Sequence, residues 1–425
     1  MHLYRLPCRQ ERRPRNYTVM ENTTHPLSAA ARPLIQASVP VLREYGLAIT
    51  RCFYARLFAQ NPELQNLFNS GNQANGAQQG SLATAVLAYA ANIDDPAALR
   101  PVIDRIAHKH ASVGIQPSQY PLVGRTLLAA IAEVLGSAAT PELLRAWEEA
   151  YGLLADELIA AEERLYRGAG ATPGELRQLV VGDVQPETAE VTSFYLETER
   201  GTSPGDFLPG QYVSVATVLS QSGLRQLRQY SLSDAPARPY WRITVKRDSG
   251  GERAPAGLVS NHLHANLRRG DRVAVSAPFG NFSPMPKDGR PLALLSAGVG
   301  VTPMISALNA LVDARHAAPV LFLHAARSPN HQSLRLDIGR ARVRLPRLTI
   351  LSFFEDIAGA VSPDVRLGRM HVTPDLVAPF LDADFYLCGP LPFMRSQWRA
   401  LRDLGVPPER IHREVFGPDL FDQLA

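Results

Sequence analysis

The spacing of apolar residues changes twice along this 425-residue chain, and the two changes restrict the folds it can adopt. From about Ser28 to Tyr166 the sequence is rich in alanine and leucine, and apolar residues recur at the 3.6-residue period of helices that pack on a core. After RGAGATPGE (Arg167–Glu175), apolar and polar residues alternate with the two-residue period of antiparallel strands. From about Arg290, continuous apolar strands alternate with helical segments, which is typical of a parallel sheet.

The chain is therefore expected to form three domains. An all-α domain over 28–167 precedes an antiparallel β-barrel over 172–286, and an α/β domain with a parallel sheet over 288–425 completes the chain. RGAGATPGE is the predicted hinge between the first two, because glycine and proline interrupt regular structure. In the strand WRITVKR, Trp241 and every second residue share one face, and Arg242 and every second residue share the other, which is expected to face water.

The excess of basic residues is confined to the N-terminus, which argues against a nucleic-acid surface. The chain has 44 Lys and Arg against 40 Asp and Glu, and residues 1–19 hold five arginines and one glutamate, so the remainder has 39 of each sign. A phosphate-binding face needs basic charge gathered on the folded part. Residues 1–27 are interpreted as a disordered N-terminal extension with Met20 as a candidate true start, because a secretory signal needs an apolar core and a transit peptide needs serine and an amphipathic period.

Cysteine usage and hydropathy favour a cytoplasmic protein with no stable membrane insertion. The three cysteines form no CxxC pair, so they indicate neither a disulfide framework nor a zinc site and suit a reducing compartment. No run approaches the ~18 apolar residues of a membrane span. A monomer is expected.

Four polar residues occupy positions where helical spacing predicts the core. In a helix over 97–113, His110 falls on the apolar stripe, whereas His108 does not. Gln78, Tyr120 and Glu162 head or interrupt similar stripes. A buried histidine or carboxylate costs several kcal/mol unless it is paired or coordinated. One such residue alone is usually hydrogen-bonded inside a bundle, but four in one domain favour a shared site, and an inward histidine is the axial ligand that a haem iron requires.

Longer segments of the helical region resemble a known family. FYARLFAQNPELQNLFN, NQANGAQQ, AYAANI and IAHKHASVGIQPSQYPLVG resemble the globin domain of bacterial and yeast flavohaemoglobins, and the resemblance extends from Ser28 to about Gly417. It implies that His110 is the proximal ligand of haem b iron. It also implies the following roles: Tyr120 and Glu162 form a polar relay to His110, Tyr54 and Gln78 face bound O2, Phe68 wedges the haem and Lys109 lies near its edge.

The chemistry of these residues fits the implied roles. A carboxylate linked to the far nitrogen of a ligating histidine makes the imidazole more anionic and fixes its tautomer, which favours O–O activation over oxygen storage. A tyrosine hydroxyl stabilises partial negative charge on O2. Only the resemblance selects Tyr54, because Phe53 and Tyr54 are adjacent and periodicity does not distinguish them.

Motifs in the barrel segment suit a flavin. RQYSLSD offers an arginine for phosphate, a ring for stacking and a hydroxyl at a strand end, although an edge strand alone would also explain it. GQYVSV precedes it, and AGLVSNHL follows, where a helix start offers backbone N–H groups to pyrophosphate. In order and spacing these resemble the FAD domain of the ferredoxin-reductase superfamily. The implied FAD-binding residues are Tyr212, Arg228, Gln229, Tyr230, Ser231, Gly257, Val259 and Ser260.

Two glycine turns in the third domain suit a pyridine nucleotide. SAGVGVTPM and YLCGPLPFM each follow a buried strand and are expected to lie side by side at the C-terminal edge of the parallel sheet. By resemblance they bind NADPH or NADH through Gly298, Val299, Gly300, Val301, Thr302, Pro303, Cys388, Gly389 and Pro390. REVFGPD resembles a C-terminal motif that borders the flavin, here Glu414, Val415, Phe416, Gly417 and Pro418, and Val415 stands where family members commonly carry cysteine.

The resemblance implies a nitric oxide dioxygenase, in which NAD(P)H reduces FAD, FAD passes single electrons to haem, and NO and O2 give nitrate. Two other classes remain open: an oxygen carrier or sensor with its own haem reductase, and a flavin or ferric reductase whose helical domain binds no haem. Arg327 follows the strand LFLHAA where related reductases read the adenosine ribose. An arginine there can pair with a 2′-phosphate or be solvated, so NADH versus NADPH is open.

Overall fold

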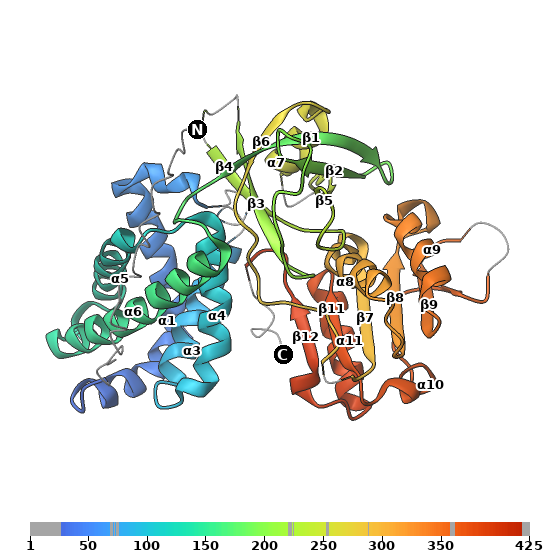
Figure 1. Ribbon diagram of the computed structural model, residues 1–425. Helices are drawn as coiled ribbons and strands as arrows, with labels where there is room; N and C mark the ends of the chain where they lie inside the picture. The colour runs from blue at the N-terminus through green and yellow to red at the C-terminus, as the bar shows by residue number, and fades with distance from the viewer. Residues whose placement is uncertain are drawn as a thin grey trace, which may run out of the picture.

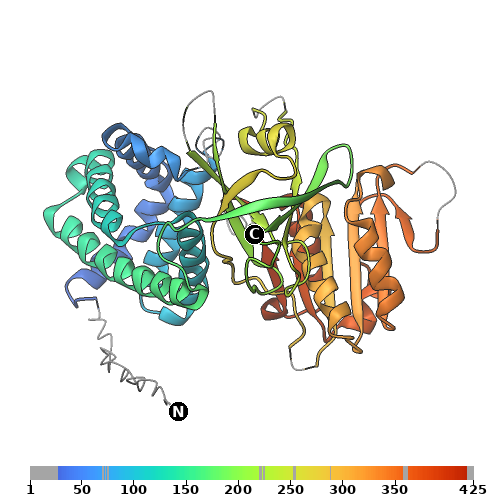
Figure 2. The ribbon, with the colours of Figure 1, turned by 45° about the horizontal axis from the view of Figure 1, so that its top comes forward.

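The computed structural model describes residues 27–68, 71, 73, 76–219, 223, 225–251, 255–287, 289–357 and 362–418. Residues 1–26 of the predicted N-terminal extension, with Met20 and Cys8, lie outside the described residues. The described chain forms three groups of elements that follow one another in sequence, and the second group lies between the other two (Figure 1; Figure 2). We call them the helical domain (α1 to α6), the barrel domain (β1 to β6) and the sheet domain (β7 to β12).

The helical domain consists of long helices that pack on α1. Its elements are α1 (Ala31–Gln60), η1 (Pro62–Asn66), α3 (Ala77–Ala91), α4 (Pro96–Val113), η2 (Pro117–Gln119), α5 (Tyr120–Leu135), η3 (Gly136–Ala138) and α6 (Pro141–Ala169). α4 begins where the Asp95 carboxylate accepts from two backbone N–H groups at 3.1 Å, and it ends at Gly114 with φ +80°. α6 continues to Ala169, so the predicted hinge begins inside a helix.

No segment long and apolar enough to span a membrane is expected from the sequence, but one helical stretch meets this criterion. The stretch Pro117–Ala138, which includes α5, is long and apolar enough by composition to cross a bilayer. Its Leu127, Ala130 and Ile131 belong to the core of the helical domain, where α5 packs on α1 and α6. Length and composition alone do not distinguish such a core helix from a membrane span.

The barrel domain is a six-stranded antiparallel sheet whose ends meet. Its elements are β1 (Arg177–Pro186), β2 (Val191–Glu197), β3 (Tyr212–Val218), β4 (Arg225–Ser231), β5 (Trp241–Lys246), α7 (Leu258–Asn266) and β6 (Arg272–Val275), and the strand order is β4-β3-β6-β1-β2-β5. A bridge between Leu232 and Ile243 joins the two edge strands and closes the barrel.

The expectation that one face of β5 is wet is wrong. Arg242 and Thr244 are buried, as are the apolar residues of the other face. The reason lies in another domain, since the guanidinium of Arg242 donates to both oxygens of Asp337 on α9 at 3.1 Å. Strand periodicity shows which side chains share a face, but not what covers that face.

The sheet domain is a parallel α/β layer, as the sequence predicts. Its elements are β7 (Leu292–Ala297), η4 (Gly298–Gly300), α8 (Val301–Asp313), β8 (Val320–Ala326), η5 (Pro329–His331), α9 (Arg335–Arg344), β9 (Leu348–Phe354), β10 (Val365–Leu367), α10 (Pro374–Val377), η6 (Ala378–Phe380), β11 (Asp384–Cys388), α11 (Leu391–Asp403), η7 (Pro408–Arg410) and β12 (Ile411–Glu414). The strand order is β10-β9-β8-β7-β11-β12.

The chain reverses its direction of travel across this sheet between β7 and β11. α8 and α9 cover one face and α11 covers the other. Ligands of open α/β sheets bind at such a reversal, beyond the carboxyl ends of the strands.

Candidate functional site

Three helices of the helical domain bring His110, Tyr120 and Glu162 together. Nδ1 of His110 on α4 lies 3.0 Å from the Tyr120 hydroxyl oxygen on α5 and 2.9 Å from Oε1 of Glu162 on α6. The Tyr120 hydroxyl donates to the same carboxylate oxygen. Glu162 is only 2% exposed, so Oε1 takes its hydrogen bonds from these two donors rather than from water.

The surroundings of Tyr120 and His110 indicate which atoms of the cluster carry protons. Burial and the neighbouring Glu162 raise the pKa of Tyr120 far above its ordinary value, so the phenol keeps its proton and donates. Nδ1–H of His110 is then the second donor to Glu162. The hydrogen bonds of His110 to described residues both use Nδ1, which leaves Nε2 as the nitrogen that can coordinate iron. This donor set fits a haem ligand.

The predicted O2-facing residues also lie together. Tyr54 of α1 is 5% exposed, and its ring lies 5.7 Å from Phe58 and 5.6 Å from Phe68 between centroids. Burial raises the pKa of Tyr54 to about 12, while a hydrogen bond with Gln78 of α3 lowers it. The Tyr54 hydroxyl therefore stays protonated at neutral pH. Phe53 is equally buried, which is why helical periodicity does not select between the two neighbours.

The space between α3 and α4 suits a flat apolar group. α3 packs mainly on α1 and α4 mainly on α6, and the two helices make few contacts with each other. Apolar side chains from both, including Leu82, Val86 and Ile106, are only half-buried, and the side chain of His110 is 33% exposed beside fully buried neighbours. Half-buried apolar side chains beside a partly exposed imidazole are what a porphyrin site needs.

Most of the predicted flavin residues gather on β3 and β4 of the barrel domain. Tyr212 pairs with Ser231 across the two strands. Alternation along β4 places Arg228 and Tyr230 on one face and Gln229 on the other. Gln229 reaches the helical domain, where its Nε2 donates to Oγ of Ser112 at 2.6 Å.

The helix start predicted to hold pyrophosphate lies at α7. Gly257 precedes α7 and Ser260 donates to its carbonyl at 3.3 Å, with no side chain capping the first N–H groups. Val259 is buried in the barrel core, so only its backbone can serve a ligand.

The two glycine turns of the sheet domain lie side by side, as the sequence predicts. A Cβ on Gly300 would lie 2.3 Å from the carbonyl oxygen of Cys388, and one on Gly389 would lie 3.1 Å from the backbone nitrogen of Ala297. This contact is at the reversal between β7 and β11. Burial and Glu414 raise the pKa of the Cys388 thiol well above its ordinary value, so the thiol is inert and the turn offers its backbone.

The C-terminal segment links all three domains. Burial and the charge of Glu414 raise the pKa of Tyr212, and Glu414 on β12 is paired with Cys388 on β11. Phe416 is 48% exposed, and Val415 is buried. Lys109 of α4 donates from Nζ to the carbonyl of Gly417 at 2.5 Å, so its ammonium lies toward this segment. Pro418 is the last described residue.

Arg327 is held by the barrel domain. Its Nη2 lies 2.5 Å from Oε2 of Glu190, and its side chain is 56% exposed. A 2′-phosphate would have to compete with that carboxylate, so the arginine does not select NADPH by itself.

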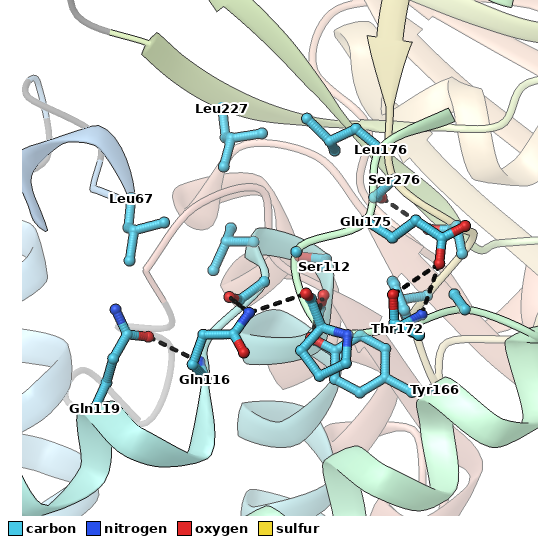
Figure 3. Close-up of a pocket in the computed structure, with 18 of the residues that line it drawn as sticks. Leu67, Ser112, Gln116, Gln119, Tyr166, Thr172, Glu175, Leu176, Leu227 and Ser276 are labelled. Atoms are coloured by element: carbon cyan, nitrogen blue, oxygen red, sulfur yellow. Dashed lines mark hydrogen bonds between the residues drawn. The ribbon is translucent and has the colours of Figure 1, made fainter. Parts of the chain in front are cut away.

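Sequence reasoning missed the residues that join the helical and barrel domains. His108 accepts from the backbone N–H of Gly280 at 2.8 Å, and burial lowers its pKa to about 4. Near this junction, a cavity of about 310 Å³ is lined by residues that include Ser112, Gln116, Tyr166, Leu227 and Ser276 (Figure 3). None of the residues predicted to face O2 or to ligate haem lines it. The sequence feature that could have indicated this contact is the position of His108 outside the apolar stripe of its helix.

Comparison with known proteins gives a consistent pattern. Family models for a globin, an oxidoreductase FAD-binding domain and an oxidoreductase NAD-binding domain match residues 51–158, 178–283 and 294–398. The flavohaemoprotein of Bordetella parapertussis is 47% identical over 401 residues, which cover 92% of this chain and 98% of that protein. The flavohaemoprotein of Rhizobium meliloti is 43% identical over 410 residues, covering 93% and 99%.

Solved structures agree with this. The flavohaemoglobin of Malassezia yamatoensis, with bound FAD and haem, superimposes with a TM-score of 0.79 at 29% identity, covering 92% of this chain and all of that one. The FAD/NAD-binding domain of nitric oxide dioxygenase from Vibrio cholerae superimposes with a TM-score of 0.52 at 38% identity, covering 57% of this chain and 99% of that one.

Proposed function

This chain belongs to the flavohaemoprotein family of haem-, FAD- and pyridine-nucleotide-dependent oxidoreductases, and from that premise we propose that it is a nitric oxide dioxygenase. Two NO and two O2 give two nitrate ions, and one NAD(P)H supplies the two electrons and becomes NAD(P)+ with release of one proton. When bound, the nicotinamide supplies a hydride, the flavin divides it into single electrons, and the haem iron holds O2.

The observation that carries the proposal is the His110–Glu162–Tyr120 cluster. Glu162 accepts from Nδ1–H of His110 at 2.9 Å, and this hydrogen bond raises the basicity of Nε2. A more basic axial imidazole donates electron density that favours O–O chemistry, and reversible storage gains nothing from it. Tyr120 donates to the same carboxylate, which holds the carboxylate in one orientation.

The second part of the proposed site is the protonated Tyr54 hydroxyl of α1, which is the proposed donor to O2. Its ring is packed against Phe58 and Phe68, so the hydroxyl is held in place before O2 arrives. A preorganised donor stabilises developing negative charge without reorganisation at the moment of reaction. Gln78 pairs with the hydroxyl and fixes the direction in which it points.

In the reductase half, we assign the paired turns at Gly300 and Gly389 to the nucleotide and the wall of Tyr212, Arg228 and Tyr230 to the flavin. The two assignments are adjacent, because Glu414 lies near both Tyr212 and Cys388. We propose the cytoplasm as the compartment, where the thiols of Cys52 and Cys388 would stay reduced, and a monomer as the active form.

The test compares two neighbouring glutamates on α6. Purified full-length protein containing haem and FAD is given NADPH, O2 and NO, and nitrate formation is followed. We expect catalytic nitrate formation, and a loss of about tenfold or more in Glu162→Gln, because removal of a buried charged acceptor costs ~1.5–3 kcal/mol. The matched control Glu163→Gln alters an exposed carboxylate one residue away and should change nothing. NADPH oxidation without nitrate would instead indicate a carrier with its own reductase.

A further inference from the structure

Three residues in the last two turns of α4 form hydrogen bonds with the reductase half. His108 accepts from Gly280 N–H at 2.8 Å, Lys109 donates to the Gly417 carbonyl at 2.5 Å, and Ser112 accepts from Gln229 at 2.6 Å. The proposed iron ligand His110 lies between these contacts on the same helix. α4 is therefore an element through which the helical domain meets β4 of the barrel domain.

Of these three residues, Ser112 is buried and uses its hydroxyl both as a donor and as an acceptor of hydrogen bonds. Its side chain is 2% exposed, and its hydroxyl donates to the carbonyl of Lys109 at 2.8 Å. On the side of the barrel domain, Nε2 of Gln229 donates to the same Oγ at 2.6 Å. One hydroxyl thus joins Gln229 of β4 to the helix of His110, as an acceptor from Gln229 and as a donor to the Lys109 carbonyl.

We propose that Ser112 is a positioning residue that holds the helix of His110 against the flavin wall and thereby sets the rate at which electrons pass from flavin to haem. The proposal rests on the proposed electron path and requires no NO chemistry. Ser112 is proposed to act through Gln229, which donates to it. The rate of electron transfer depends on the separation and orientation of the two cofactors, so a shift of α4 relative to β4 should change that rate.

Other contacts preserve the fold when Ser112 is changed. The Arg225 N–H donates to Oδ1 of Asn66 at 2.9 Å, and the ring of Tyr166 lies 5.7 Å from that of Phe279. These contacts hold the helical and barrel domains together independently of the serine. Its removal should therefore shift the fit between α4 and β4 without separating the domains.

The test follows reduction by NADPH without oxygen or NO, in the full-length protein with haem and FAD. Ser112→Ala should leave flavin bleaching at its normal rate and slow haem reduction about tenfold, which corresponds to ~1.4 kcal/mol. Reduction of ferricyanide by the flavin should be unchanged. Ser112→Thr, which keeps the hydroxyl, should restore most of the rate.

Ser38→Ala is the matched control. Ser38 is a buried helical serine that donates to the carbonyl three residues earlier, at 2.6 Å, as Ser112 does, but it lies on α1 away from the flavin wall. A second readout is amide hydrogen exchange of the α4 C-terminus and β4, which should rise in Ser112→Ala only. Equal haem-reduction rates in the two alanine variants would overturn the proposal. So would equal slowing of flavin bleaching and haem reduction, because that places the effect before the flavin.

Failure of the proposed function gives a different result. If the protein reduces its haem normally but makes no nitrate from NO, the dioxygenase proposal fails and the role of Ser112 is still measured. If haem reduction is insensitive to Ser112 while nitrate forms, the positioning role fails alone.

Discussion

Replacing Arg242 by methionine should destabilise the reductase half by about 3–5 kcal/mol, the usual cost of removing one partner from a buried ion pair. The Arg242 side chain is 5% exposed. It donates to both oxygens of Asp337 at 3.1 Å, and its Nη1 lies 3.8 Å from Oδ2 of Asp234. Asn309 on α8 bridges these carboxylates, at 2.6 Å to Asp337 and 2.9 Å to Asp234. The substitution would leave two buried carboxylates without their main counter-charge.

The pH dependence of this loss has a defined sign. Burial raises the pKa of Asp234, but the charges of Arg242 and Arg238, with the hydrogen bonds from the Ala235 N–H and the Asn309 amide, together outweigh burial and lower the pKa below its ordinary value. In the wild type, this carboxylate therefore contributes stability at pH above its unfolded pKa, and the contribution is lost as pH falls through the folded pKa. Without Arg242, burial dominates and the folded pKa rises. The variant should then gain stability as pH falls from 7 toward about 5, so that its deficit narrows.

Urea unfolding followed by flavin release measures the effect, and the midpoint should fall by about 1–2 M. The matched control is Arg272→Met, which removes an exposed pair with Glu199 at 2.6 Å and should cost at most ~1 kcal/mol. Arg242→Met combined with Asp337→Leu should recover part of the loss, since an apolar pair can replace a buried ionic one. The reasoning is refuted if Arg242→Met and Arg272→Met unfold at the same urea concentration.

Three further predictions concern the proposed sites. Tyr54→Phe should weaken O2 binding about tenfold through loss of one hydrogen bond, measured by O2 titration of the reduced protein; Tyr45→Phe, an exposed tyrosine on the same helix, should have no effect. Gly300→Ala should raise the KM for NADPH or slow flavin reduction by at least tenfold, because its Cβ would lie 2.3 Å from the Cys388 carbonyl. The control is Gly339→Ala, whose Cβ would have nothing within 4 Å. Equal kinetics in the two variants would contradict the paired-turn site. Glu190→Gln should release Arg327 and lower the KM for NADPH up to about fivefold relative to NADH, within the range of a surface ion pair; an unchanged ratio would remove Arg327 from ribose recognition.

Helical spacing identified His110, Tyr120 and Glu162 as polar residues at core positions because that signal is local, whereas their link to one another came from the resemblance. A polar residue on an apolar helical stripe must be paired or coordinated, and His110, Tyr120 and Glu162 are each visible from the spacing of their own helix. The glycine turns at Gly300 and Gly389 are visible for a similar reason, since each directly follows a buried strand. The order of domains follows from the changes in period alone.

What escaped prediction depends on contacts between domains. Arg242 looked like a solvated residue because its partner Asp337 is 95 residues away. The pairing of Arg327 with Glu190 spans 137 residues, and no local pattern records it. Ser112 does not belong to the apolar stripe of α4 that includes His110. Its proposed role depends on the hydrogen bond with Gln229, which forms where β4 packs against α4. Periodicity identifies faces, whereas tertiary packing decides what each face contacts.

The measurement that tests the central claim most directly is the yield of nitrate per NADPH when the purified protein, with haem and FAD, consumes limiting NO in air. The proposed function predicts two nitrate ions for each NADPH oxidised above the background rate, with the yield lost when His110 is replaced by alanine. NADPH oxidation that NO does not accelerate, with no nitrate formed by protein that contains haem, would contradict it.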